Sequence, residues 1–250
     1  ENSLQQLRPT APMQIRRKQK PDSGLTRLEV VAILVALAFL LLPALNRIAS
    51  DKSPAYRVIC TSSLKQVSLG LLLWSEDQRG RFSFQVSTNE GGSLEYGGVS
   101  NTFRHFQMAS NQIHSPKVLV CPADKERVKA QRNDPLWKAK SASDLARMWL
   151  SLNNGQVSYF VNLDAEKSKP QSVLVGDGNV SNRGFDRQQY LLASSNNPPQ
   201  WSRAQHHWPY LNSPEGNVAF ADGSVLQASD DMLPRYFRHV IGTTNRLAVP

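Results

Sequence analysis

The sequence predicts an α+β fold in which a long N-terminal helix packs against a small antiparallel sheet. Three observations lead to this prediction. Residues 30–45 form an unbroken run of sixteen apolar residues, and an apolar stripe at helical spacing follows it. Later segments, 156–163 and 172–176, are rich in β-branched and aromatic residues, and an Asp-Gly pair separates two further apolar segments.

Length, composition and charge limit the number of domains, the class of protein and the kind of partner. The 250 residues, 40% hydrophobic and 20% charged, fit one ordinary domain with an N-terminal appendage. A mean hydropathy of −0.41 excludes a polytopic membrane protein. The net charge of +9 is dispersed apart from a basic cluster at 16–20, so we expect no nucleic-acid partner.

The apolar run is long enough to cross a membrane. With Leu28 and Glu29 it reaches eighteen residues, or about 27 Å of helix against a hydrocarbon core of about 30 Å. The basic cluster before it predicts a cytoplasmic N-terminus and an exported C-terminal part. The apolar run and the residues before it could be a secretory signal, an uncleaved anchor, or a leader followed by a helix. Residues 45–50, which follow the run, fit a secretory cleavage site poorly.

The residues before the run favour the third alternative. Ser23-Gly24-Leu25-Thr26-Arg27-Leu28-Glu29-Val30 resembles the cleavage site of type IV prepilins and type II secretion pseudopilins. The resemblance implies that a prepilin peptidase cuts after Gly24 and methylates Leu25. It also implies that Glu29 pairs with the N-terminus of a neighbouring subunit. Two residues depart from the family: Leu25 replaces the commoner Phe or Met, and Arg27 could compete for Glu29. Met13 is a candidate start residue.

The helix is expected to continue beyond the membrane. Pro43 and Pro54 predict bends or a break. An apolar stripe then follows at spacings of four, three, four and three, with Ser68 and Ser75 off the stripe and Gly80 as a stop signal. The stripe consists of Cys60, Leu64, Val67, Leu71 and Trp74. We therefore expect a leader at 1–24, a membrane helix at 25–45, its amphipathic continuation at 46–80 and a globular α+β domain at 81–250.

Three further motifs resemble a pilin-like subfamily of planctomycetes and verrucomicrobia, the H-x9-D-G (DUF1559-like) group. They are the C-x-x-x-L-K-Q segment that begins at Cys60, the segment 121–124 (Cys-Pro-Ala-Asp) and the pair Asp222-Gly223. The histidine of the last signature is absent from its expected place, and His207 lies farther upstream.

The two cysteines, Cys60 and Cys121, lie in these motifs. In an exported domain they could form one disulfide, or they could be two separate small buried residues. They form no metal-binding cluster with histidine.

Elements of the globular domain follow from local patterns. We predict strands at 117–121, 156–163 and 172–176, and a helix at 143–152 capped by Ser143 or Asp144. Segments 217–221 and 224–227 predict a hairpin closed by a tight two-residue turn at Asp222-Gly223. Segments 89–100 and 194–200 are predicted loops, and Asp230 and Asp231 are predicted to cap a last helix ending near 240.

The sequence carries little sign of catalysis. Hydrolase and metalloprotease motifs are absent, so we expect neither an enzyme nor a cofactor. Asp177 and His207 are weak metal-ligand candidates.

The expected function is a structural subunit of a type II secretion or type IV pilus-like filament, in the bacterial inner membrane. Its partners would be prepilin peptidase, other pilin-like subunits and an assembly platform. Alternatives are an anchored receptor that never polymerises and an anchored hydrolase using His207 with Asp222 or Asp177.

Overall fold

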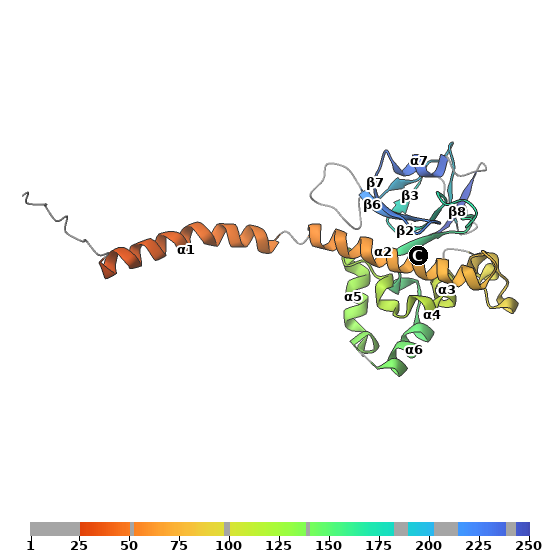
Figure 1. Cartoon of the computed structure of the whole chain (residues 1–250), viewed down its shortest axis with the longest axis horizontal. Helices are drawn as coiled ribbons and strands as arrows, with labels where there is room; N and C mark the ends of the chain where they lie inside the picture. The colour runs from red at the N-terminus through yellow and green to blue at the C-terminus, as the bar shows by residue number, and fades with distance from the viewer. Residues whose placement is uncertain are drawn as a thin grey trace, which may run out of the picture. The chain divides into compact units, whose positions relative to one another are not determined.

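The computed structural model describes residues 26–50, 53–97, 101–138, 141–182, 190–202, 215–238 and 244–250. The chain divides into two compact units, 1–51 and 52–250. Figure 1 shows the helix of the first unit and the mixed helical and sheet structure of the second. The α+β class predicted from the sequence is confirmed.

The first unit contains helix α1, Arg27–Ser50. The helix continues through Pro43 and ends five residues beyond the apolar run. Its described large apolar side chains are exposed, by fractions between 41% at Val30 and 83% at Leu28. No described residue of this unit covers these side chains, so the helix needs an apolar environment from elsewhere.

The second unit is built around helix α2, Ser53–Asp77. Pro54 lies in its first turn, where the missing N–H costs nothing. All five residues of the predicted stripe are buried, which confirms it. Ser68 and Ser75 are also buried, because α2 is covered on two sides, and their hydroxyls donate to the carbonyls of Lys65 and Leu72.

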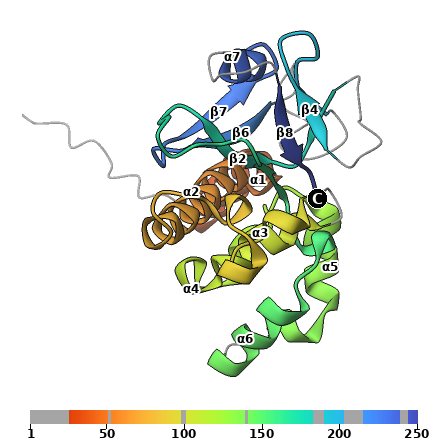
Figure 2. The same cartoon turned by 90° about the vertical axis from the view of Figure 1, so that its right-hand side faces the viewer.

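The sheet lies on one side of α2 (Figures 1 and 2). Six antiparallel strands have the order β4-β8-β1-β2-β6-β7. Their bounds are β1 Tyr159–Asn162, β2 Val173–Asp177, β4 Leu191–Ala193, β6 Glu215–Phe220, β7 Val225–Ser229 and β8 Asn245–Ala248. A second sheet pairs β3, Val180–Ser181, with β5, Gln200–Trp201. Helix α7, Leu233–Arg238, packs near β5.

Short helices cover the other side of α2 (Figure 2). The α-helices are α3 Thr102–Met108, α4 Ser110–Ile113, α5 Lys125–Asn133 and α6 Ala142–Ser151. The 3-10 helices are η1 Ser83–Gln85, η2 Thr88–Glu90, η3 Leu94–Tyr96, η5 Pro116–Leu119, η6 Pro135–Lys138 and η7 Asn154–Gln156.

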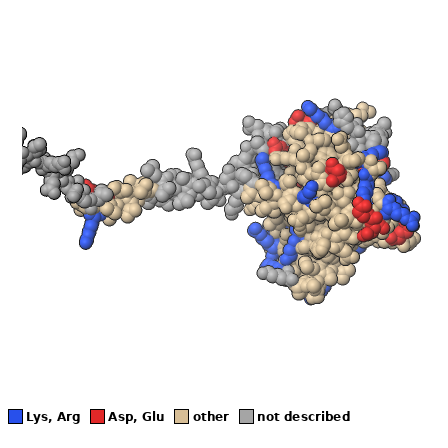
Figure 3. All heavy atoms as spheres, viewed as in Figure 1, with Lys and Arg blue, Asp and Glu red and all other residues tan. Residues whose placement is uncertain are grey.

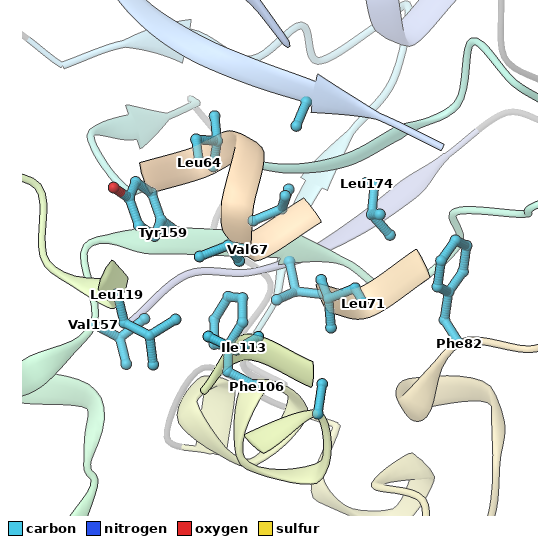
Figure 4. Close-up of a cluster of buried hydrophobic side chains, with 14 of the residues drawn as sticks. Leu64, Val67, Leu71, Phe82, Phe106, Ile113, Leu119, Val157, Tyr159 and Leu174 are labelled. Carbon is cyan, nitrogen blue, oxygen red and sulfur yellow. The ribbon is translucent and has the colours of Figure 1, made fainter. Parts of the chain in front are cut away.

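The main core lies between these layers. Figure 4 shows α2 side chains lying between sheet residues such as Tyr159 and Leu174 and residues of the helical layer such as Phe106. Each of these side chains is fully buried. Because α2 contributes to both interfaces, its loss would expose both layers, which makes it the central element of the domain.

Several local predictions need correction. Residues 116–119 form the helix η5 instead of a strand, because Pro116 fits a first helical turn and the Ser115 hydroxyl accepts from the Lys117 amide. Helix α6 is capped by Ser141, earlier than predicted. The last helix begins at Leu233, since Asp230 accepts a hydrogen bond from the Trp201 amide and is used there. The predicted loop 89–100 overlaps η2 and contains η3, and the predicted loop 194–200 ends on the first residue of β5.

One described segment, Ala55–Asp77 within α2, is long and apolar enough to cross a membrane. Half of its most apolar window is buried inside the domain. The core helix of a soluble domain meets the same criterion, and the burial of α2 fits that role.

Candidate functional site

The first turn of α1 holds the described part of the predicted processing segment. The Glu29 carboxylate oxygen Oε2 accepts hydrogen bonds from the Thr26 amide at 2.8 Å and the Thr26 hydroxyl at 3.0 Å. In return the Glu29 amide donates to the Thr26 hydroxyl at 3.3 Å. This reciprocal arrangement is a capping box, which satisfies orphan amides at a helix start.

The sequence analysis expected Arg27 to compete for the Glu29 carboxylate and did not identify Thr26 as its hydrogen-bond partner. Among the ion pairs of the described residues, none joins Arg27 to Glu29. The signal for Thr26 was present, because Thr-x-x-Glu before an apolar run is the capping-box pattern. Gly24 and Leu25 lie outside the described residues, as does His207.

A second group of predicted residues meets on α2. Cys60, in the second turn of α2, forms a disulfide with Cys121, with the Cα atoms 5.1 Å apart. Both residues are fully buried. The bridge joins segment 121–124 to the helix that carries the C-x-x-x-L-K-Q motif, across 61 residues of sequence.

Asp124, at the end of this segment, starts α5 and is buried. Its carboxylate accepts from the Arg127 amide at 3.2 Å, the Arg127 guanidinium at 2.8 Å and the Ser158 hydroxyl at 2.9 Å. Ser158 directly precedes β1 in the sheet. The Cys-Pro-Ala-Asp motif therefore ties the sheet, α5 and α2 together, and its aspartate has a structural task as helix cap and ion-pair partner.

The Asp222-Gly223 turn contacts the same helix. Lys65 of α2 donates from Nζ to the Gly223 carbonyl at 2.7 Å. A methyl group on Gly223 would lie 3.2 Å from Leu72 and 3.3 Å from Leu69, both on α2. The three motifs identified separately in the sequence thus meet on α2.

The turn is wider than predicted. A two-residue type I′ turn needs positive φ at both central residues, but only Gly223 has it, at +80°. The Gly223 amide donates to the Phe220 carbonyl at 2.9 Å, and the Phe220 amide donates to the Ser224 carbonyl. The loop is therefore a type I turn followed by a left-handed glycine, a common three-residue alternative.

Asp222 stabilises this loop. Its Oδ1 accepts from the Ser224 amide at 2.8 Å and the Ser224 hydroxyl at 2.6 Å. Partial burial acts to raise the pKa of Asp222, but the hydrogen bonds from Ser224 and the nearby Lys65 charge outweigh it and lower the pKa. The carboxylate is therefore held ionised as a turn-forming group.

Asp177 belongs to a buried polar chain. Its Oδ2 accepts from the Asn217 amide at 2.8 Å and side-chain Nδ2 at 2.9 Å, and the Asn217 Oδ1 accepts from Thr61 of α2. Tyr159 lies opposite Asp177 in the β1–β2 register. Burial, then the Asp177 charge, raise the Tyr159 pKa well above its usual value. Within the described ranges no three His, Cys, Asp or Glu residues are grouped to hold a metal.

A polar groove of about 510 Å³ lies where α2 ends. It is lined by Glu76, Arg79, Gly80, Gln85, Glu166, Lys167 and Ser168. Glu76 and Lys167 form an ion pair, and Glu166 pairs with Lys169. These pairs already satisfy most of the charges lining the groove, so the groove offers little unpaired charge to a ligand.

The candidate site residues fall into two groups, the capping box of α1 and the motif junction on α2. Neither group has the arrangement of nucleophile, base and electrostatic stabiliser that catalysis needs. The first is suited to presenting a helix start, and the second to locking a sheet onto a helix. No protein-family model, curated protein or solved structure matches the chain.

Proposed function

We propose that the chain is a pilin-like structural subunit that is cut after Gly24 by a prepilin peptidase and assembled through α1. The observation that carries the proposal is α1 itself. It places sixteen consecutive apolar residues on one helix with its described side chains uncovered, directly after the Gly24-to-Glu29 motif. A membrane before assembly and neighbouring helices after it would supply the missing apolar contact.

Glu29 is suited to join two subunits. Both hydrogen bonds from Thr26 go to Oε2, and no described residue donates to Oε1. A protonated N-terminus from a neighbour can therefore bind Oε1 while the capping box persists. Glu29 is exposed in the isolated chain, and its charge would need such a partner once the helix lies in an apolar surrounding.

The disulfide supports export of the second unit. Disulfides persist in oxidising compartments such as the bacterial periplasm and are rare in the cytosol. An exported domain behind a single inner-membrane helix agrees with the basic cluster at 16–20. We therefore assign the chain a cytoplasmic N-terminus and a periplasmic domain.

The test is the intact mass and N-terminal sequence of membrane-extracted protein, produced with and without a prepilin peptidase. We expect a peptidase-dependent N-terminus at methylated Leu25. Gly24→Val should leave the chain at precursor mass, because the cut requires the smallest residue at this place. Ser23→Ala is the matched control and should be processed.

An uncut chain, or a cut near Ala49, would overturn the proposal. An uncut chain that stays in the membrane would favour an anchored receptor, which requires neither Gly24 nor Glu29. Glu29→Gln separates the two functions further. We expect it to be processed yet to form no filament in the presence of the assembly machinery.

A further inference from the structure

Helix α5 lies on the surface of the domain and contributes no buried residue to its core. None of its nine residues is buried. Lys125, Lys129 and Arg132 are all exposed and lie at positions i, i+4 and i+7. At 100° per residue they fall within about 60° of arc, and Glu126 lies about 60° outside it. We name these three residues the basic face of α5.

The three cations of the basic face have no acidic partner among the described residues. Eight cations elsewhere in the described domain pair with carboxylates, namely Arg57, Arg81, Arg127, Arg147, Lys167, Lys169, Arg235 and Arg246. Not all do, since Lys65, Arg79 and Arg104 form no ion pair with a described carboxylate. No described carboxylate lies within ion-pair distance of Lys125, Lys129 or Arg132. In Figure 3 blue spheres without red ones gather at the lower left of the domain, the region of α5 in Figure 1.

The face is held near the end of the domain that joins α1. Cys121, four residues before Lys125, is bonded to Cys60, and Asp124 caps α5 from a buried position. Cys60 is seven residues, or about 10 Å, from the start of α2. In the sequence, only two residues separate the start of α2 from the last residue of α1.

We propose that the basic face of α5 binds anionic phospholipid headgroups at the surface of the membrane that α1 spans. The inference rests on the proposed function for the anchoring of α1. Clustered Lys and Arg residues close to a membrane helix are attracted to anionic lipid. The tether removes most of the cost of association, because it keeps the face at high local concentration beside the bilayer.

The contact would hold the domain against the membrane before assembly. Each Lys or Arg near an anionic surface strengthens binding about fivefold, so three give about a hundredfold. A subunit drawn into a filament leaves the lipid surface and releases the face. Nucleic acid is the competing anionic partner, but the tether favours lipid alone.

The test uses the full chain reconstituted into vesicles. One set contains phosphatidylcholine and the other a mixture of phosphatidylcholine and phosphatidylglycerol, both with a headgroup-labelled quencher lipid. A fluorophore on a non-canonical amino acid at the exposed Asn133 reports how near α5 is to the headgroups without adding a thiol. We expect quenching several-fold stronger in the mixed vesicles, and its loss in 1 M salt, where the screening length is about 3 Å.

Two variants make the test specific. Lys125→Gln, Lys129→Gln and Arg132→Gln together should reduce quenching in mixed vesicles to the phosphatidylcholine level. Arg81→Gln, Lys169→Gln and Arg235→Gln remove the same charge from ion pairs elsewhere in the domain and should leave the quenching unchanged.

Equal quenching in both vesicle types, or unchanged quenching in the triple variant of the basic face, would overturn the inference. So would salt-sensitive binding of duplex DNA through these residues without lipid-dependent quenching. Resistance of the vesicle-bound chain to alkaline carbonate is measured in the same samples and reports on α1. Its loss in both vesicle types would count against the proposed function, and the quenching would still decide on the basic face.

Discussion

His105 is the most strongly perturbed histidine among the described residues. It is fully buried, its Nδ1 lies 2.8 Å from the Ser93 hydroxyl, and no described residue bonds to Nε2. Its ring meets Phe84 edge-on. Burial lowers the pKa of His105 to about 4, because a charged imidazolium cannot be solvated there.

The low pKa of His105 makes the domain sensitive to acid. As pH falls, the unfolded chain takes up this proton near pH 6.5 and the folded chain only near pH 4. The part of the unfolding free energy that depends on a neutral His105 is fully present above pH 6.5. It is lost as the pH falls from 6.5 to 4, by up to about 3 kcal/mol. Urea unfolding measured across this pH range should show the loss.

His105→Asn provides the direct comparison. Asparagine can keep the bond to Ser93 but does not titrate. This variant should therefore be less stable at neutral pH, and its unfolding free energy should lack the part of the pH dependence that comes from His105. His114→Asn is the control, because it makes the same substitution at an exposed histidine. An unchanged slope in His105→Asn would contradict the assignment.

Gly223→Ala tests the contact between the hairpin turn and α2. Gly91 has a similar φ of +84° but no atoms within 4 Å of an added methyl group, so Gly91→Ala measures the backbone cost alone. That cost is about 1–2 kcal/mol. Gly223→Ala should cost more by up to about 1 kcal/mol, since its methyl group would press on Leu69 and Leu72. Equal losses in the free energy of unfolding would refute the contact.

Among the elements, the disulfide holds the helical layer to α2. It closes a loop of 61 residues, for which chain entropy predicts about 4 kcal/mol. Cys60→Ala with Cys121→Ala should lose about 2–4 kcal/mol of unfolding free energy in urea melts. Reductant should destabilise the parent chain and leave the double variant unaffected, and an equal response of both would contradict this role.

The elements differ in how much of them the sequence could predict. The α2 stripe and segments 156–163, 172–176 and 217–227 were found because their apolar periods are local. Helix α5 was missed because it buries nothing and therefore has no apolar period. Strands β4 and β8 were missed because they are short and gain stability from pairing with each other and with β1, which are distant in sequence.

The site was predictable in its parts but not in its arrangement. Cys60, Cys121 and Asp222 were each marked by a motif, whereas the contact of Lys65 with Gly223 spans 158 residues. Such a contact depends on the packing of a sheet on a helix, which no local pattern encodes. Thr26 was predictable, since the capping-box pattern to which it belongs spans only four consecutive residues.

At the scale of the whole molecule, two apolar helices follow each other and only one is expected to enter the membrane. Leu34→Arg with Leu37→Arg should release the chain from the membrane on carbonate extraction, since each arginine costs about 3 kcal/mol at the centre of a span. Leu69→Arg with Leu73→Arg is the matched control in α2. Leu34 and Leu73 are similarly exposed, at 59% and 56%.

We expect the α2 variant to remain in the membrane. Its substituted side chains lie on the exposed side of a helix already packed in the domain. Release of the α2 variant with retention of the α1 variant would assign the membrane span to α2 and contradict the proposed function.

The position of the disulfide has a mechanical consequence. If α1 is pulled, tension enters the domain at Ser53 and runs along α2. Seven residues later it meets a covalent branch at Cys60, through which load passes into segment 121–124 as well as onward along the helix. The rest of α2 can then peel from the sheet only if the helical layer moves with it, so the domain would resist traction as one body.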